Sequence, residues 1–491
     1  MMKKITIILT VLGFMLISSC EDFLDVRPSN YANPETSITT STDAKVAING
    51  LMRKMTSSLY YGRNFVIYGD AKGGDFAIRS QGRGLDYYYS FNHSASSGSG
   101  SGFWNQIYHC ILQANNLIGN IQKIEDEGNG STLLSEYKAQ AMTARALMYF
   151  DLVRLYGKMY NMEKASYGVP LVLEPLEFTA KPTRASVEEV YTQILKDLGD
   201  AAPLLSKNRA TTKGYINYYV NKAIEARVHL FMDNFTGSLA AAEAVINSGS
   251  YSLYSNDDWV DSWASQFGSE SIFELAIFPS EADLTTGSLG YYLLRNGKKT
   301  GAMGWFMASD YWIARMNQDP TDIRWGIMER DESSTTRKGS SLKYVGGTAL
   351  EGDKGSISAV NVKVIRLSEM YLIAAEAALR LPTPDKVKAA NYLNQIRKRA
   401  PGLAAATDAT VTLDMIIDEK SKEFFAEGLR YFDMLRLNRT IEFNDEFISP
   451  AVVITHREKT LDRTFYKTIL PIDKGELDAN PAIVPQQNPG Y

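Results

Sequence analysis

The chain has 491 residues, of which 45% are hydrophobic and 22% are charged, a composition typical of a folded protein with a large apolar core. Its formal net charge of −4 gives no electrostatic reason to bind the phosphate backbone of a nucleic acid, so we exclude that class of partner. Two cysteines cannot form a disulfide framework of the kind found in small secreted domains.

The first segment has the organisation of a bacterial lipoprotein signal peptide, which we assign to residues 1–19. Lys3–Lys4 forms a positive region, and Ile5–Ile17 is an apolar run too short to span a bilayer. Ser18–Ser19 supplies the small residues that precede a cleavage site, and Cys20 follows directly. We therefore predict that Cys20 is lipidated and anchors the chain to the outer membrane.

The segment after the cysteine is expected to connect this anchor to the folded body. The acidic pair Glu21–Asp22 resembles the surface-export signal of some Gram-negative lipoproteins, so we expect the anchored protein to face the cell exterior. Residues 20–40 contain prolines and many small polar residues and are predicted to be an extended leader. Residues 41–491 are then expected to form a single domain.

Paired helical segments recur in the rest of the chain. In three of them, alanines alternate with large apolar residues at three- or four-residue spacing, which lets another helix approach closely, as in tetratricopeptide-type repeats. The predicted pairs are Asp43–Leu59 with Trp104–Ile121, Tyr137–Tyr156 with Val187–Leu205, Tyr219–Phe235 with Ser238–Asn247, and Glu369–Leu381 with Asp385–Arg399. Ser186 and Glu189 form a capping box that predicts the start of one helix. The predicted fold is mainly α, a tetratricopeptide-like scaffold of about four helix pairs.

Two insertions interrupt this scaffold, near residues 60–102 and 255–362. Both are rich in glycine and aromatic residues and lack periodicity over the length of a helix. Long ordered loops on a rigid scaffold are where binding sites usually occur. We therefore expect a ligand to be bound by these insertions.

Several motifs follow one another in a fixed order along the chain. They are Phe23-Leu24-Asp25 with Pro28, Trp104-Asn105-Gln106-Ile107-Tyr108 with Ala114-Asn115, the stretch Ala144–Gly157, Arg366 with Glu369, Glu427-Gly428 with Arg430, Leu470-Pro471-Ile472, and Gln487–Tyr491. In this order and coverage the chain resembles the RagB/SusD family of outer-membrane nutrient-binding lipoproteins. The resemblance implies a non-enzymatic protein that covers a SusC-like TonB-dependent transporter and binds a glycan. Because one branch of the family serves peptide uptake, capture of oligopeptides is the alternative.

Sugar recognition needs aromatic rings that stack on the C–H face of a pyranose, together with amide, carboxylate and arginine groups that bond its hydroxyls. From the two insertions we predict ligand contacts by the rings of Tyr87, Tyr88, Tyr89, Tyr291, Tyr292, Trp305 and Phe306, and by the polar side chains of Asp70, Asp75, Arg79, Arg83 and Asn92. Since consecutive side chains of an extended segment point to opposite sides, about half of the three consecutive tyrosines should face inward.

The motifs of common enzymes and metal sites are missing from the sequence. It has no HExxH, no GxSxG, no P-loop and no EF-hand spacing, and its four histidines are far apart. Glu419, Glu423 and Glu427 lie at four-residue spacing, with Arg430, Asp433 and Arg436 following, and are expected on one helix. Acid–base catalysis is one hypothesis for this set. We favour a salt-bridge network, because alternating basic groups lower carboxyl pKa values, and we expect no catalytic residue, metal or cofactor.

Overall fold

The computed structural model describes residues 38–82, 84–96, 102–177, 179–278, 285–295, 301–331, 335–346, 359–447 and 452–491. The predicted signal peptide, Cys20 and most of the predicted leader lie outside these residues, as does Arg83. In the described part of the chain, no helix is both long enough and apolar enough to cross a membrane.

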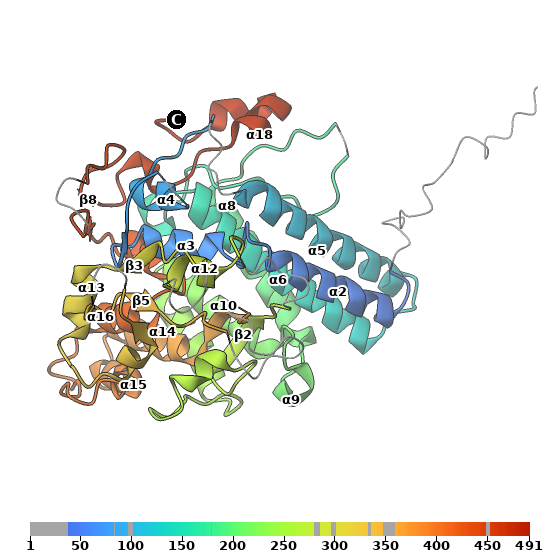
Figure 1. Cartoon of the computed structure of the whole chain (residues 1–491). Helices are drawn as coiled ribbons and strands as arrows, with labels where there is room; N and C mark the ends of the chain where they lie inside the picture. Colours follow the sequence, from blue (N-terminus) through green and yellow to red (C-terminus); the bar gives the residue numbers. More distant parts are fainter. Residues whose placement is uncertain are drawn as a thin grey trace, which may run out of the picture.

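Four helix pairs form the scaffold (Figure 1). They are α2 (Ser41–Met55) with α5 (Phe103–Asp126), α6 (Thr132–Tyr156) with α8 (Val187–Ala201), α10 (Tyr218–Phe231) with α11 (Phe235–Ile246), and α14 (Leu367–Leu379) with α15 (Lys386–Arg397). Helix α5 also packs on α6, and α11 packs on α14, so that neighbouring pairs are joined. The four predicted pairs and the tetratricopeptide-like fold class are confirmed.

Local sequence explains where these helices begin and how closely they pack. Thr40 with Asp43 and Ser186 with Glu189 form reciprocal capping boxes at the starts of α2 and α8. The alanines of α14 are fully buried, namely Ala374, Ala375, Ala377 and Ala378. Their small side chains allow α11 and α15 to pack against the same helix.

The insertions contain short elements rather than long helices. The first holds α3 (Asn64–Ala71), β1 (Phe76–Ile78) and α4 (Asp86–Ser90). The second holds η3 (Asp261–Ala264), β2 (Ser271–Leu275), α12 (Leu289–Leu293), β3 (Phe306–Ala308), α13 (Asp310–Met316), η4 (Ile323–Ile327), β4 (Met328–Glu329) and β5 (Ser340–Ser341). Strand β2 pairs antiparallel with β6 (Val362–Arg366), and β4 pairs with β5. The expected extended conformation of Tyr87–Tyr89 is wrong, because these residues form the centre of α4.

The C-terminal part of the chain, from α16 onward, packs in part against the first helix pairs. It contains α16 (Leu413–Glu423), α17 (Arg430–Arg436), β7 (Ile441–Glu442) paired with β8 (Thr460–Leu461), η5 (Tyr466–Thr468), α18 (Lys474–Ala479) and η6 (Pro481–Gln486). The backbone N–H of Leu470 donates to the Leu155 carbonyl (2.8 Å), which fixes this part to the end of α6. Three further short elements lie in the described part of the chain: α7 (Tyr160–Glu163), η2 (Ala202–Leu204) and α9 (Arg209–Thr212).

The charged set between Glu419 and Arg436 does not lie on one helix, contrary to the prediction. Helix α16 ends at Glu423, and the chain then passes through Ala426 (φ 66°) and Gly428 (φ 80°) before α17 begins. A left-handed backbone conformation cannot continue a right-handed helix. The three- and four-residue spacing therefore spans two helices joined by a tight turn.

Candidate functional site

The two insertions meet along a short strand pair. Strand β1 runs antiparallel to β3, with Ile78 opposite Phe306 and Phe76 opposite Ala308. Beyond the strands, the backbone N–H of Arg79 donates to the Trp305 carbonyl (3.3 Å). The residues that follow β1 therefore lie beside those that precede β3, although they are far apart in the sequence.

Glycine at position 84 permits a close contact between α4 and α12. Gly84 has φ +63°, and a Cβ there would lie 3.2 Å from Tyr292 Cε1, 3.3 Å from Met303 Sδ and 3.6 Å from Trp305 Cδ1. Helix α12 is fixed on the other side by the Ser288 hydroxyl, which accepts from the Tyr291 backbone N–H (3.2 Å). The turn before α4 is thus packed directly on the aromatic residues of the second insertion.

This packing leaves two of the predicted rings at the surface and places the others beneath them. Tyr87 and Tyr291 are half-buried, whereas Tyr88, Tyr89, Tyr292, Trp305 and Phe306 are buried. The Tyr291 and Tyr292 rings are 5.2 Å apart and nearly perpendicular. Burial raises the pKa of the Tyr87 hydroxyl, which therefore stays protonated and able to donate. The prediction of ligand contact keeps its basis for Tyr87 and Tyr291. Of the buried rings, Tyr88 packs on Tyr87 and Tyr292 on Tyr291, and none of the five is exposed to a ligand.

Two polar side chains stand near these rings. The Arg63 guanidinium lies 5.6 Å from the centroid of the Tyr292 ring and donates to Asn64 Oδ1 (2.8 Å) and the Thr286 carbonyl. Asn92 is exposed, and its backbone N–H donates to the Tyr87 carbonyl (3.1 Å). The sequence did not single out Arg63, because no motif surrounds it. Its position in the first insertion was the one available signal.

The predicted acidic contacts are occupied by internal bonds instead. Asp70 accepts from the Gly428 backbone N–H (2.7 Å), and burial raises the pKa of its carboxyl. Asp75 accepts from the Ser421 hydroxyl (2.6 Å) and pairs with the guanidinium of Arg315 (3.1 Å). Both aspartates are buried and attach the first insertion to the C-terminal helices, so the structure corrects their predicted role. Arg79 is half-buried next to the strand pair, and Arg83 lies outside the described residues.

The carboxylates of α16 belong to a buried salt-bridge network. Glu423 is fully buried and lies 2.9 Å from Arg366 Nη1 and 3.1 Å from Arg399 Nε. Burial alone would raise the pKa of Glu423, but Arg399, Arg366 and Arg324 hold it well below its usual range. A carboxyl group that carries no proton near neutral pH cannot act as a general acid. Within the described residues, no group of three or more histidine, cysteine or acidic side chains has an arrangement that could hold a metal ion.

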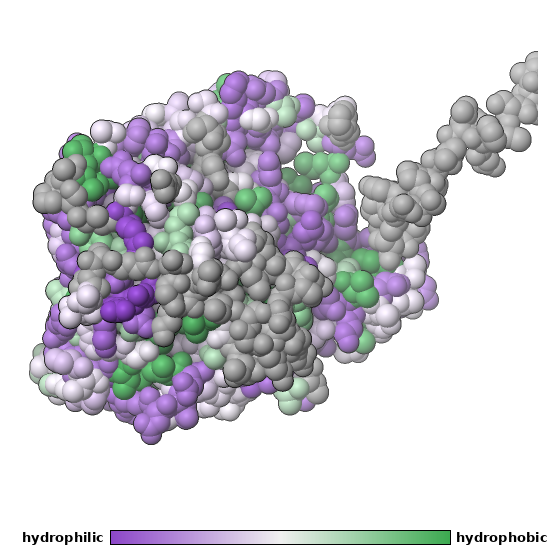
Figure 2. All heavy atoms as spheres, viewed as in Figure 1, coloured by the Kyte–Doolittle hydropathy of each residue, from purple (hydrophilic) through white to green (hydrophobic). Residues whose placement is uncertain are grey.

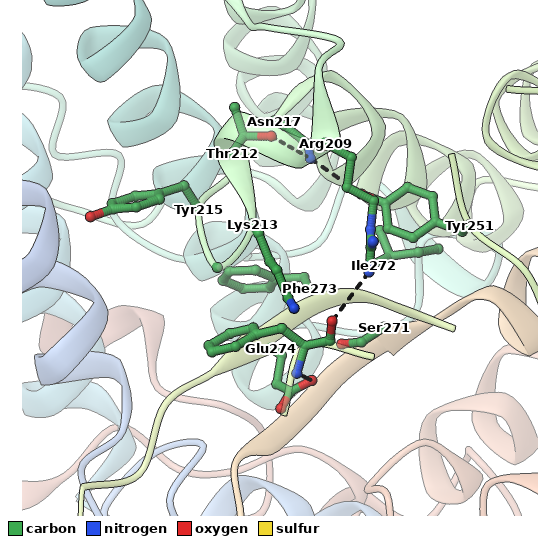
Figure 3. Close-up of a pocket in the computed structure, with 12 residues that line it drawn as sticks. Arg209, Thr212, Lys213, Tyr215, Asn217, Tyr251, Ser271, Ile272, Phe273 and Glu274 are labelled. Carbon is green, nitrogen blue, oxygen red and sulfur yellow. Dashed lines mark hydrogen bonds between the residues drawn. The ribbon is translucent and has the colours of Figure 1, made fainter. Parts of the chain in front are cut away.

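A hollow lies between the loop after α9 and strand β2 (Figure 3). Its inner part measures about 10 Å³, which is room for one water molecule. Figure 3 shows its polar groups bonding one another: Asn217 Nδ2 donates to Thr212 Oγ1 (3.1 Å), and Arg209 Nη2 to the Phe267 carbonyl (3.3 Å). The walls at Lys213 and Phe267 also border a groove of about 600 Å³ along α2, which is mainly apolar. We do not assign the ligand to this hollow, because its inner part has room for only one water molecule.

On the face shown in Figure 2, apolar residues form small separate groups among hydrophilic ones. The fold and site together define a helical-repeat binding protein, in which a rigid scaffold carries aromatic side chains on two converging insertions.

Comparison with known proteins identifies the family. Residues 22–230 match a family model described as "Starch-binding associating with outer membrane", and residues 269–491 match the model of the SusD family. A SusD superfamily protein from Bacteroides thetaiotaomicron is 34% identical, with a TM-score of 0.82 over 92% of this chain and 100% of that one. One from Bacteroides vulgatus is 32% identical, with a TM-score of 0.81 over 92% and 100%. The SusD-like protein P2 of Formosa agariphila is 26% identical over the full length of both chains. This chain belongs to the SusD family.

Proposed function

We propose that this protein captures a glycan at the cell surface, without catalysing a reaction, and passes it to a SusC-like TonB-dependent transporter of the outer membrane. One observation carries the proposal: Tyr87 and Tyr291, from insertions far apart in the sequence, are half-buried at the surface, and each packs on a buried tyrosine, Tyr88 and Tyr292 respectively. Ring faces of this kind stack on sugar C–H groups. Arg63, which lies against the Tyr292 ring, and the exposed Asn92 are the side chains that we expect to bond sugar hydroxyls.

The kinship and the predicted anchor support the same function. One solved relative with the same fold is a laminarin-binding SusD-like protein, 22% identical with a TM-score of 0.69 over 92% of this chain and 99% of that one. The description of the matching family model refers to starch binding and to the outer membrane. A lipid on Cys20 would hold the protein at that membrane, beside its transporter.

Isothermal titration of the purified protein against a panel of polysaccharides that includes laminarin and starch tests this function. We expect binding to at least one glycan, and a loss of about tenfold or more in affinity for Tyr87→Ala and for Tyr291→Ala. Tyr167→Ala is the matched control, because Tyr167 is an exposed tyrosine on a different loop. Binding of oligopeptides but of no glycan would contradict the proposed ligand class and favour the peptide alternative.

Delivery to a transporter has its own test. Purification of the lipidated protein from native outer membranes should recover a TonB-dependent barrel in a stable complex. A Cys20→Ser variant should lose the membrane association while keeping its glycan affinity, because the anchor and the ligand site are separate. Recovery of the wild-type protein without any barrel would contradict this part of the proposal.

A further inference from the structure

Lys72 is fully buried between the end of α3 and the end of α4, and its ammonium group faces aromatic rings. Its Nζ lies 3.9 Å from the centroid of the Phe91 ring, 4.5 Å from that of Tyr68 and 5.4 Å from that of Tyr431. Rings placed around a cation in this way stabilise it through their negative faces. Such a cage is an unusual site for a lysine, because buried charges are normally paired with an opposite charge.

The same nitrogen has three hydrogen-bond acceptors within reach. They are Tyr68 Oη at 3.3 Å, His93 Nε2 at 3.2 Å and the Lys467 carbonyl oxygen at 3.4 Å. An ammonium group has three N–H donors, so each has an acceptor. Among the contacts of Lys72 with described residues there is no carboxylate.

Phe91 is the residue that this cage constrains most directly. It ends α4 in the left-handed conformation, with φ 55° and ψ 27°, which is disfavoured for a bulky side chain. In this conformation its backbone N–H donates to the Tyr88 carbonyl (3.3 Å), and that of Asn92 donates to the Tyr87 carbonyl (3.1 Å). The turn that presents Tyr87 and Asn92 therefore depends on a strained residue whose ring rests on Lys72.

His93 continues the contact to the C-terminal segment. Tyr491 Oη donates to the Ile469 carbonyl (2.8 Å) and lies 3.1 Å from His93 Nδ1. The Tyr491 hydroxyl proton is already donated to Ile469, so Oη can only accept from His93. His93 Nδ1 must therefore carry the ring proton, and Nε2, which carries none, accepts from Lys72. His93 is thus a neutral imidazole in one defined tautomer, assigned from its hydrogen bonds.

Only one of the two side chains, Lys72 or His93, can carry a positive charge in this buried site. A second proton would place two cations 3.2 Å apart in a buried site. Burial and the nearby Lys72 lower the pKa of His93, and burial also lowers that of Lys72. The other titratable groups around the pair are Tyr68, Tyr431, Tyr491, Lys467 and His456, which add no negative charge near neutral pH.

We propose that Lys72 is a positioning residue for the ligand site: with His93 and Tyr491, it holds Phe91 in the left-handed turn that presents Tyr87 and Asn92. The inference rests on the proposed function only for the identity of the ligand. The arrangement is also sensitive to acid. Below the ordinary histidine pKa of about 6.5, Lys72 and His93 are both protonated in an opened or unfolded chain. In the folded structure, Lys72 is charged and His93 is neutral, so the folded state binds one proton fewer. The turn is therefore held at neutral pH and loosens as the pH falls.

Histidine-selective ¹⁵N NMR tests this without any ligand, because the chain has only four histidines. We expect His93 to stay neutral, with a proton on Nδ1, as the pH falls through the ordinary histidine pKa of about 6.5. In Lys72→Met, which keeps the length of the side chain and removes the charge, the titration of His93 should shift toward higher pH. Protonation of wild-type His93 at the ordinary histidine pKa of about 6.5, or an unchanged titration in Lys72→Met, would overturn the proposal.

Hydrogen exchange and binding test the consequence for the site. Tyr491→Phe removes only a hydroxyl group, and we expect it to speed amide exchange across residues 86–93 about tenfold. Tyr466→Phe is its control, because Tyr466 lies next to Tyr491 (ring centroids 5.4 Å apart) and is exposed.

Binding is measured with laminarin as the probe. Tyr491→Phe should bind laminarin more weakly than the wild type does. The affinity of the wild type itself should fall as the pH is lowered below about 6.5. Equal exchange in both variants would refute the positioning role. If laminarin does not bind the wild type, only the choice of ligand fails, and exchange still decides.

Discussion

Arg227 and Glu369 form a bidentate ion pair that joins α10 to α14. Arg227 Nε lies 2.7 Å from Glu369 Oε1, and Nη2 lies 2.6 Å from Oε2, with both side chains buried. Nη2 also donates to the Val364 carbonyl (3.0 Å) on β6. One guanidinium therefore connects the third helix pair to the fourth and to β6, at the end of the second insertion.

Removing one partner of this pair should cost far more stability than removing both. Arg227→Met leaves the Glu369 carboxylate buried without its partner, and we expect a loss of about 3–5 kcal/mol in the free energy of unfolding. The double variant Arg227→Met/Glu369→Leu should recover much of that loss, since apolar side chains can replace a buried pair. Denaturant titration of Arg227→Met, Glu369→Leu and the double variant, each against the wild type, measures these losses. Additive losses would show that the two residues do not act as a pair.

Glu376 should make the protein sensitive to acid. It is fully buried and accepts from Arg436 Nη2 (2.7 Å) and Lys420 Nζ (2.8 Å). Burial alone would raise its pKa, but Arg436 and Lys420 hold it well below the usual range. Its contribution is fully present above the unfolded pKa of about 4.3 and is lost as the pH falls further, because the unfolded chain then binds the proton.

The corresponding experiment compares the wild type with Glu376→Gln over pH 3 to 7. The variant should be less stable by about 3–5 kcal/mol near neutral pH, and the difference should shrink steadily below pH about 4.3. Glu188→Gln is a control at an exposed surface pair with Lys164, where little change is expected. A difference that stays constant across this pH range would contradict the assigned ionisation.

Cys110 should be unreactive in the folded protein. It is fully buried on α5, and burial raises the pKa of its thiol to about 12. Because the thiolate is the reactive species, iodoacetamide at pH 8 should not label it. In a Cys20→Ser variant Cys110 is the sole thiol, so mass spectrometry reports on it directly. Labelling should appear only in denaturant, and rapid labelling of the native protein would show that α5 opens.

The helix pairs could be predicted because their signals are local. Alanine and leucine at helical spacing, and the Ser186–Glu189 capping box, act within a few residues, and the structure contains both. The break between α16 and α17 was missed because the charge spacing continues through it. Gly428 was the available signal, since a glycine inside a helical pattern often marks a helix end.

The candidate site could be predicted only in part, because burial there depends on distant residues. Asp75 is bonded to Ser421, 346 positions away, and Asp70 to Gly428, 358 positions away. A sequence pattern shows that a side chain is aromatic or acidic, but it does not show which far segment covers it. That the insertions bind the ligand stays a prediction, and the choice between Tyr87 at the surface and Tyr88 in the core needed the packing of α4 on α3.

Two neighbouring glycines allow the architecture of the site to be tested separately from backbone strain. Gly82 and Gly84 both have positive φ values, +87° and +63°, so alanine carries a similar backbone penalty at either position. A Cβ at position 82 meets nothing within 4 Å, whereas one at position 84 presses on Tyr292 and Met303. Gly84→Ala should therefore push α4 away from α12 and separate the exposed rings of Tyr87 and Tyr291.

We expect Gly84→Ala to weaken glycan binding by about tenfold or more, and Gly82→Ala to change it little, with both variants losing about 1 kcal/mol of stability. Titration calorimetry and thermal unfolding of the same two samples measure these quantities. The comparison isolates the contact between the insertions, because the backbone effect is common to both variants. Equal affinities would mean that the ligand does not bridge α4 and α12, and the site would then have to be sought elsewhere on the scaffold.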